Sequence, residues 1–201
     1  GWRVHATVRS LEKAKALEKV KGDLNVHVLD VTDRGAIKDL ARNLEREGID
    51  VLIANAGIKG PKGEFGELDF EDWKQTFVTN SIAPVMLAQA FLGHVLASEQ
   101  KKFVAISSIM GSITENTGGS AYAYRASKAA LNMAWRSLAA EVAGKNAIAT
   151  IYHPGWVRTD MGGPDAAISP EESAAGLCRV IGGLTLKQSG RFFDYTGEEL
   201  P

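Results

Sequence analysis

The chain has 201 residues, of which 45% are hydrophobic and 23% charged, a composition typical of a soluble globular protein with one sizeable core, so we expect a single domain. Its formal net charge of −1 at pH 7 gives no reason to expect nucleic acid or an anionic membrane as a partner. Cys178 is the one cysteine, so no internal disulfide can form; this is consistent with a reducing compartment, and we expect a cytoplasmic protein.

Strand-like and helix-like patterns alternate along the chain. The alternating pattern at 2–8 predicts a strand rather than a signal peptide. Ser10 and Asp33 are placed to cap the two helices that follow. The longest apolar stretch, 82–97, is interrupted by proline and polar residues and is too short to span a bilayer. The predicted strands are 2–8, 25–29, 51–54, 103–107, 147–152 and 191–195. The predicted helices are 11–20, 34–47, 70–97, 122–143 and 170–182.

This order of elements predicts the fold class. Strands that alternate with helices imply right-handed crossovers and a mostly parallel sheet with helices on both faces. The run 51–54 is continuously apolar, as expected of a strand that is covered on both faces. We therefore expect an α/β fold with a doubly wound sheet.

Tyr124 and Lys128 are the first candidates for chemistry. They lie four residues apart on a predicted helix and so project from one face. A nearby cation lowers the pKa of a tyrosine from its usual value near 10, which favours proton exchange with a carbonyl or an alcohol near neutral pH. Ser108 closes the apolar run 103–106, where a strand should end beside a cleft. A Tyr-x-x-x-Lys pair alone is more often an ordinary helix face, and its weight here comes from the other motifs.

Six motifs together resemble the short-chain dehydrogenase/reductase family. They are Asp30 after a strand, Asn55-Ala56-Gly57, Asn80, Ile106-Ser107-Ser108, Tyr124-x-x-x-Lys128 and Pro154-Gly155-x-Val157-x-Thr159. The longer stretches 107–113, 124–128 and 153–161 are most similar to the C-factor and sniffer-type carbonyl reductase branch of that family. The resemblance covers almost the whole chain.

The resemblance implies a catalytic tetrad of Asn80, Ser108, Tyr124 and Lys128. Ser108 would hydrogen-bond the substrate carbonyl oxygen, and Tyr124 would transfer the proton as hydride leaves the nicotinamide. Lys128 would lower the tyrosine pKa and bind the nicotinamide ribose, while Asn80 would hold a water that links Lys128 to solvent. No metal site is expected.

The position of the serine requires a choice. The family usually has it about 13 residues before the tyrosine, which here is Gly111, so choosing Ser108 implies a three-residue insertion within 114–120. Ser112 is the alternative serine. Tyr122 has Ala126 four residues further on, so it lacks a lysine partner.

The resemblance also implies a nucleotide site, in which each motif has a structural alternative. Asp30 with Val31 would bracket the adenine ring, unless Asp30 only caps a turn or helix. Arg9, at the end of the first strand, favours the 2′-phosphate of NADP over NAD, unless it is simply a solvated arginine. The remaining contacts would be Asn55, Ala56 and Gly57 beside the adenine ribose, and Pro154, Gly155, Val157 and Thr159 with Tyr124 and Lys128 around the nicotinamide.

One family feature does not occur in this sequence. There is no Thr-Gly-x-x-x-Gly-x-Gly turn, the element that binds the pyrophosphate at a helix N-terminus. We expect a sheet that lacks its first β-α unit, because that strand is central in the family order 3-2-1-4-5-6-7 and its absence leaves two strand edges unpaired. We favour an incomplete representation of a longer protein over a real truncation.

Two functions remain open at this point. The first is an NADP-dependent oxidoreductase that reduces a small ketone or aldehyde or oxidises the alcohol. The second is a non-catalytic signalling or interaction protein of the same fold with impaired nucleotide binding. A homodimer through the helices 70–97 and 122–143 can accompany either. The substrate would contact loops 57–66, 111–120 and 156–169, where Trp156 and Met161 suggest an apolar pocket.

Overall fold

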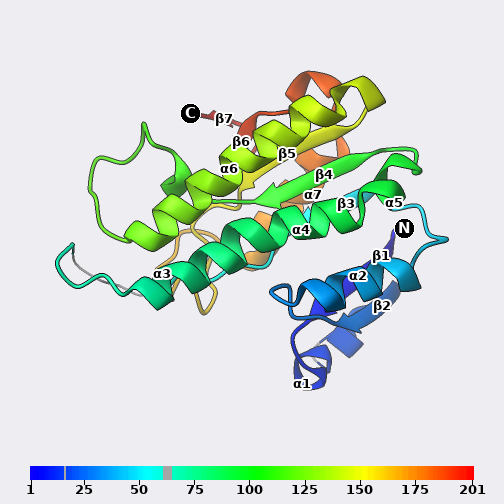
Figure 1. The fold of residues 1–201 in the computed structure, drawn as a ribbon, viewed down its shortest axis with the longest axis horizontal. Coiled ribbons are helices and arrows are strands. Elements are labelled where there is room, and N and C mark those ends of the chain that lie inside the picture. The colour runs from blue at the N-terminus through cyan, green and yellow to red at the C-terminus, as the bar shows by residue number, and fades with distance from the viewer. Residues whose placement is uncertain (16, 61–64) are drawn as a thin grey trace.

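The computed structural model describes residues 1–15, 17–60 and 65–201 and contains two sheets with helices on both faces (Figure 1). The smaller sheet is two-stranded with the order β1-β2, and the larger is five-stranded with the order β3-β4-β5-β6-β7. All neighbouring strands are parallel except the antiparallel pair β6-β7. The mostly parallel α/β fold is confirmed. The strands are β1 (Arg3–Val8), β2 (Asp23–Val28), β3 (Val51–Ala54), β4 (Lys102–Ile106), β5 (Ile148–His153), β6 (Phe192–Asp194) and β7 (Glu199–Leu200).

The helices differ from the prediction in three places, the first being that the helix predicted at 34–47 ends at Asn43. The predicted helix 11–20 forms only two short pieces, with Ala16 outside the described residues, and Ser10 makes no capping hydrogen bond. The predicted helix 70–97 is divided into four pieces, one of them a π-helix. By contrast, Asp33 caps its helix by accepting from Gly35 N and Ala36 N. The helices are α1 (Leu11–Ala14), η1 (Leu17–Lys19), α2 (Arg34–Asn43), α3 (Phe70–Phe77), η2 (Val78–Ile82, the π-helix), α4 (Ala83–Ala90), α5 (Leu92–Leu96), η3 (Ile109–Gly111), α6 (Tyr122–Val142), η4 (Ala143–Lys145), α7 (Pro170–Gly182) and η5 (Leu186–Gln188).

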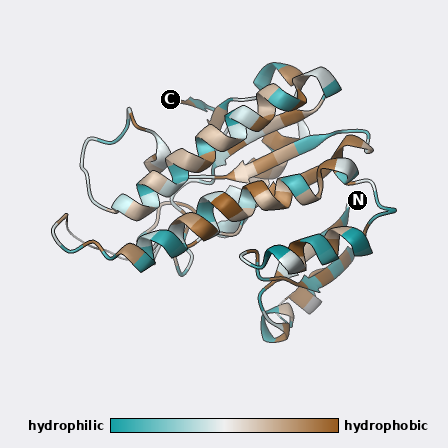
Figure 2. Ribbon diagram, in the orientation of Figure 1, coloured by the Kyte–Doolittle hydropathy of each residue, from teal (hydrophilic) through white to brown (hydrophobic). Residues whose placement is uncertain are grey.

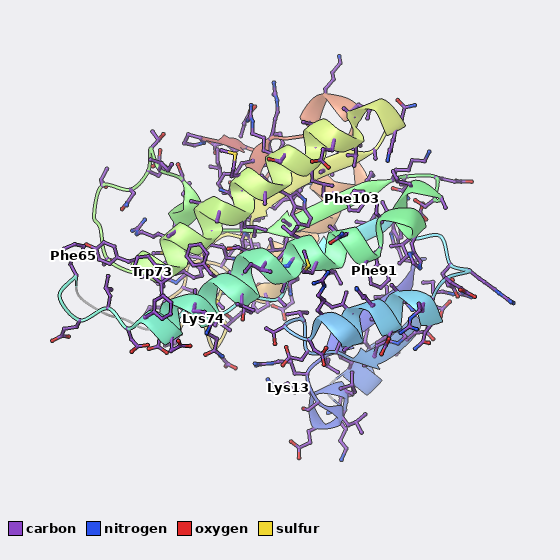
Figure 3. The ribbon with its side chains drawn as sticks, viewed as in Figure 1. Lys13, Phe65, Trp73, Lys74, Phe91 and Phe103 are labelled. Carbon is purple, nitrogen blue, oxygen red and sulfur yellow. The ribbon has the colours of Figure 1, made fainter. Side chains whose placement is uncertain are left out.

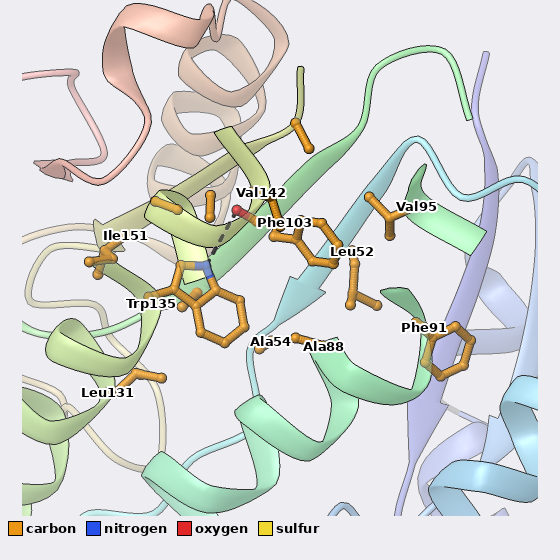
Figure 4. Packing of buried hydrophobic residues seen from close by; sticks show 14 of the residues in the cluster. Leu52, Ala54, Ala88, Phe91, Val95, Phe103, Leu131, Trp135, Val142 and Ile151 are labelled. Atoms are coloured by element: carbon orange, nitrogen blue, oxygen red, sulfur yellow. Dashed lines mark hydrogen bonds between the residues drawn. The ribbon is translucent and has the colours of Figure 1, made fainter. Parts of the chain in front are cut away.

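Two hydrophobic cores cover the opposite faces of the larger sheet. The first lies under α4 and α6, where Trp135 is fully buried and its Nε1 donates to Phe103 O at 3.4 Å (Figure 4). The second includes Val104 and Ile106 of β4 together with Ile181 of α7. Alternate residues of β4 thus enter alternate cores, which fixes this strand at the centre of the layers.

The two sheets are separated where a central strand would lie. In the described part of the chain, neither β1 nor β3 pairs with a strand on its remaining edge. Apolar side chains of the two strands that border this gap are exposed, including Val4 at 45% and Ile53 at 46%. The described residues thus form one sheet on each side of the missing strand, and β7, which was not predicted, adds an antiparallel strand beside β6. Figure 2 shows that α4 is hydrophobic along much of its length, whereas α2 presents a hydrophilic outer face. None of the described helices has both the length and the apolar character needed to cross a membrane.

Candidate active site

Tyr124 and Lys128 lie at the start of α6, beside the carboxyl end of the parallel sheet. Both side chains are buried, with 9% and 4% exposure. Lys128 Nζ donates to Ile106 O, the last residue of β4, at 2.9 Å and lies 5.9 Å from the centre of the Tyr124 ring. The carboxyl ends of strands are where open parallel sheets bind ligands. The structure thus brings the two residues together at a site suited to chemistry.

Ser108 lies next to this pair. It lies two residues after the end of β4 at Ile106, and its Oγ caps η3 by accepting from Met110 N at 3.2 Å. Ser108 is 7% exposed and hydrogen-bonds with Tyr124 closely enough to affect the pKa of the phenol. Because Oγ accepts from Met110 N, the single hydroxyl proton can be donated either to the Tyr124 phenol or to a bound molecule beside it.

Gly111 shows why the serine is displaced from the usual family spacing. A Cβ at this position would lie 2.9 Å from both the carbonyl carbon and the Cβ of Lys128. A serine at 111 would therefore collide with α6. Ser112, the alternative, uses its Oγ to accept from Glu115 N at 3.3 Å.

The protonation of Tyr124 differs from the expectation. Burial raises the pKa of its hydroxyl, and hydrogen bonding with Ser108 lowers it only in part. The predicted lowering by Lys128 is not the controlling effect, because the ammonium itself is buried against Ile106 O and its own pKa falls to about 8. Tyr124 is consequently a protonated donor at neutral pH.

Asn80 lies in the π-helix η2 and is fully buried. Its Oδ1 accepts from Ile58 N at 2.8 Å, and its Nδ2 donates to Ile58 O at 2.8 Å and to Ser127 Oγ at 3.0 Å. Both amide hydrogens are thus used in holding the loop after β3 against α6. A π-helix within a longer helix often marks a functional site, and here it places Asn80 between the two segments.

The loop after β3 approaches the catalytic pair closely. Asn55 and Ala56 are exposed, whereas Gly57 is packed against the site. A Cβ at Gly57 would lie 3.3 Å from Asn80 Oδ1 and 3.5 Å from Lys128 Nζ. Glycine is therefore the residue that lets this backbone lie beside the lysine.

Asp30 and Arg9 lie near each other at the ends of β2 and β1. Asp30 Oδ1 accepts from Thr32 N at 2.8 Å and from Thr32 Oγ1 at 2.7 Å, so this oxygen caps a turn. These hydrogen bonds, and to a smaller extent the charge of Arg9, lower the pKa of the carboxyl. Arg9 is exposed and Val31 half-buried. Asp30 therefore caps a turn with Oδ1, as the structural alternative predicts, while Oδ2 can still accept a hydrogen bond from a ligand.

The Pro154-Gly155 turn is held by residues that sequence patterns did not reveal. Ser173 of α7 donates its hydroxyl to Pro154 O at 2.6 Å. Gly155 has a φ of +86°, and a Cβ there would lie 3.1 Å from the Tyr195 ring. Val157 forms a bridge with Ile168, and Thr159 Oγ1 accepts from Gly162 N at 3.2 Å.

Exposed apolar side chains lie on the loops that were predicted to contact the substrate. Trp156 is 55% and Met161 40% exposed. Phe65 is at the tip of the loop before α3 and its ring lies 5.5 Å from that of Tyr122 (Figure 3). Of the predicted pocket loop 57–66, residues 61–64 lie outside the described residues. Lys59 adds a cation to these loops, and its Nζ donates to Met161 O at 3.3 Å.

Comparison with known proteins gives consistent similarities. Residues 1–167 match the family model described as short chain dehydrogenase. The C-signal of Myxococcus xanthus is 43% identical over 165 residues, which cover 82% of this chain and 99% of that protein. The carbonyl reductase Sniffer of D. melanogaster is 34% identical with a TM-score of 0.93, over 98% of this chain and 86% of that chain. An NADPH-bound carbonyl reductase from chicken fatty liver is 32% identical with a TM-score of 0.89, over 98% and 86%.

Proposed function

The chain belongs to the short-chain dehydrogenase family, and we propose that it is an NADP-dependent oxidoreductase that reduces a ketone or aldehyde, or oxidises the alcohol. The observation that carries this proposal is the convergence of Ser108, Tyr124 and Lys128 at the carboxyl end of β4. The similarity to carbonyl reductases, one of them NADPH-bound, supports the reaction and the cofactor.

The residues divide the chemistry between them. Ser108 donates a hydrogen bond to the carbonyl oxygen of the substrate, keeps its proton, and stabilises the charge that develops there. Tyr124, kept protonated by burial, gives its proton to that oxygen. The Lys128 ammonium donates one N–H to Ile106 O and can donate its other N–H groups to a ribose. NADPH supplies the hydride when it is bound.

The residues fit the two ends of a dinucleotide unequally. Gly57 and the Pro154-Gly155 turn allow close backbone approach around the nicotinamide end, and Arg9 offers an exposed cation to a 2′-phosphate. The sequence has no Gly-rich turn to supply backbone donors to the pyrophosphate. We expect weak NADPH binding by this chain alone.

A second function, a non-catalytic signalling or interaction protein, is favoured by the unpaired edges of β1 and β3. Open strand edges are templates for another chain. In that case a partner would pair with these edges, and Tyr124 would have no role in the biological effect.

Replacing Tyr124 by Phe tests the first function. NADPH binding is measured by quenching of tryptophan fluorescence, and turnover by the loss of NADPH absorbance with aldehyde and ketone substrates. We expect Y124F to retain NADPH binding with a modest loss of affinity, because one hydroxyl contact near the nicotinamide is removed, and to lose roughly 100-fold or more in kcat. Y122F is the matched control, because Tyr122 has no lysine partner, and it should retain activity. A folded chain that does not bind NADPH, or equal activity in both variants, would favour the second function.

A further inference from the structure

Ser127 lies at a junction of segments in the candidate active site. It is 0% exposed and precedes Lys128 on α6. Its hydroxyl donates to Tyr124 O at 2.8 Å and accepts from Asn80 Nδ2 at 3.0 Å. A serine has one proton, so the direction of both hydrogen bonds is determined. Ser127 therefore connects the first turns of α6 to the π-helix η2.

A second hydrogen bond holds Ser127 from the same side. Ser81 Oγ, also in η2, donates to Ser127 O at 2.7 Å. This arrangement differs from that of an ordinary serine on a helix. Ser137, also on α6, is exposed, and within the described part of the chain its hydroxyl bonds only to Met133 O of its own helix, at 3.1 Å. Ser127 donates within its own helix as Ser137 does, and in addition it accepts from Asn80 of another element.

The connection continues through Asn80 to the loop after β3. Asn80 holds both the N–H and the carbonyl oxygen of Ile58, so the path of hydrogen bonds is Ile58, Asn80, Ser127, Tyr124. One end of this path adjoins Gly57, which lies against Lys128 Nζ. The other end is the turn that carries the proton-donating phenol. Every member of the path is buried or partly buried, so water is a poor substitute for a lost partner.

We propose that Ser127 is a positioning residue that couples the 55–58 loop to the Tyr124–Lys128 turn. The catalytic part of this assignment rests on the proposed function. Removing the hydroxyl leaves one Asn80 hydrogen without a partner inside the protein and frees Asn80 to release Ile58. The 55–58 loop and the Tyr124 phenol are then no longer held in a fixed position relative to each other. The proton donor therefore spends less time in the productive geometry.

Amide hydrogen exchange tests the coupling without any need for turnover. In S127A we expect the Ile58 amide to exchange about tenfold faster, the effect of weakening one buried hydrogen bond. The amide of Val104, in the central strand β4, should be unchanged. S137A should alter neither amide. An unchanged Ile58 amide in S127A, or an equal rise at Ile58 and Val104, would overturn the proposal, because the first shows no coupling and the second only general destabilisation.

Kinetics then test the catalytic part. We expect S127A to lower kcat roughly tenfold while the Kd for NADPH changes less than about threefold, and S137A to change neither. The variants N80A and S127A should not be additive in log kcat, because they interrupt one path. Additive losses would show that Ser127 does not act through Asn80. If the unsubstituted chain neither binds NADPH nor turns over, the proposed function fails, and the exchange result alone decides the role of Ser127.

Discussion

At the scale of the residue, the close approach of Gly111 to Lys128 excludes any larger residue at position 111. The backbone of η3 lies against α6, and a Cβ at 111 would be 2.9 Å from two Lys128 atoms and 3.1 Å from Ala129 N. Most of these are backbone atoms or atoms next to the backbone, which cannot turn aside. The geometry therefore excludes a serine at 111 and supports the prediction of Ser108, at the strand end.

Replacing Gly111 by Ala should separate η3 from α6. We expect a loss of about 1–3 kcal/mol in the free energy of unfolding, the usual effect of overpacking, together with a fall in activity as Lys128 moves. Urea denaturation measures the first and NADPH oxidation the second. Gly118→Ala is the control, since a Cβ there meets nothing within 4 Å. Equal stability of the two variants would show that the contact is not tight.

The buried ammonium of Lys128 makes stability depend on pH. Its pKa is about 8 in the folded protein, against an ordinary value of 10.5, because burial disfavours the charged form. Between these values the unfolded chain binds more protons than the folded chain, so the free energy of unfolding rises as pH rises from about 8 to 10.5. In K128M this contribution is absent.

The comparison of K128M with the unsubstituted chain isolates the effect. As pH rises from about 8 to 10.5, we expect the free energy of unfolding of the unsubstituted chain to increase relative to that of K128M by up to roughly 3 kcal/mol. Urea unfolding at closely spaced pH values measures the difference. A difference that does not change with pH would mean that Lys128 titrates normally in the folded protein.

The residues that could be predicted from the sequence are those with a spacing or an end-of-strand position. Tyr124 and Lys128 follow from helical periodicity, and Ser108 from the apolar run before it. Ser127 and Ser173 could not be found as supporting residues, because a single hydroxyl has no periodic signal and their partners, Asn80 and Pro154, are distant in sequence. The raised pKa of Tyr124 also depends on burial, which the spacing does not reveal.

At the scale of the element, the main difference from the prediction is the broken helix between 70 and 97. The apolar periodicity continues through the segment, but Thr79, Asn80 and Ser81 are buried and polar at its centre. Asn80 and Ser81 find partners on α6 and the 55–58 loop, and the π-helix turns them there. A pattern of apolar residues predicts which face of a helix packs against the core. It does not predict that one turn of the helix becomes a π-helix.

The start of α6 contains strain that a substitution can relieve. Ser120 and Ala121 both have positive φ, at 60° and 47°, directly before the helix. A left-handed conformation costs an L-residue roughly 1–2 kcal/mol, whereas glycine adopts it freely. Ala121→Gly should therefore leave the free energy of unfolding unchanged or raise it by up to about 1 kcal/mol.

Ala140 offers the opposite case on the same helix. It is exposed in the regular interior of α6, and Ala140→Gly should lower the free energy of unfolding by about 1 kcal/mol. Thermal and urea unfolding of the two variants give the comparison. The same sign for both would show that the turn at 120–121 is not strained.

At the scale of the whole molecule, the sheet order and the gap within it follow from the family pattern. The resemblance implies the order 3-2-1-4-5-6-7, in which the family's first strand is central. The structure has β1 and β3, the strands that would flank that family strand, and no described strand between them. Composition and periodicity alone predict an α/β sheet but not this order, because strand order depends on crossovers between distant segments. The gap has a physical consequence, since β1 and β3 present open edges beside exposed apolar side chains.

These open edges should make the chain self-associate. A second copy can add a strand at β3, and Ile53, 46% exposed, supplies apolar contact there. Ile53→Lys places a charge at this edge, and we expect it to slow the growth of aggregates several-fold at equal concentration, as measured by light scattering. Leu186→Lys is the control, because Leu186 is 51% exposed on η5, which belongs to neither open strand. Equal slowing by both variants would indicate that charge as such prevents association, and the open edge would then not be its cause.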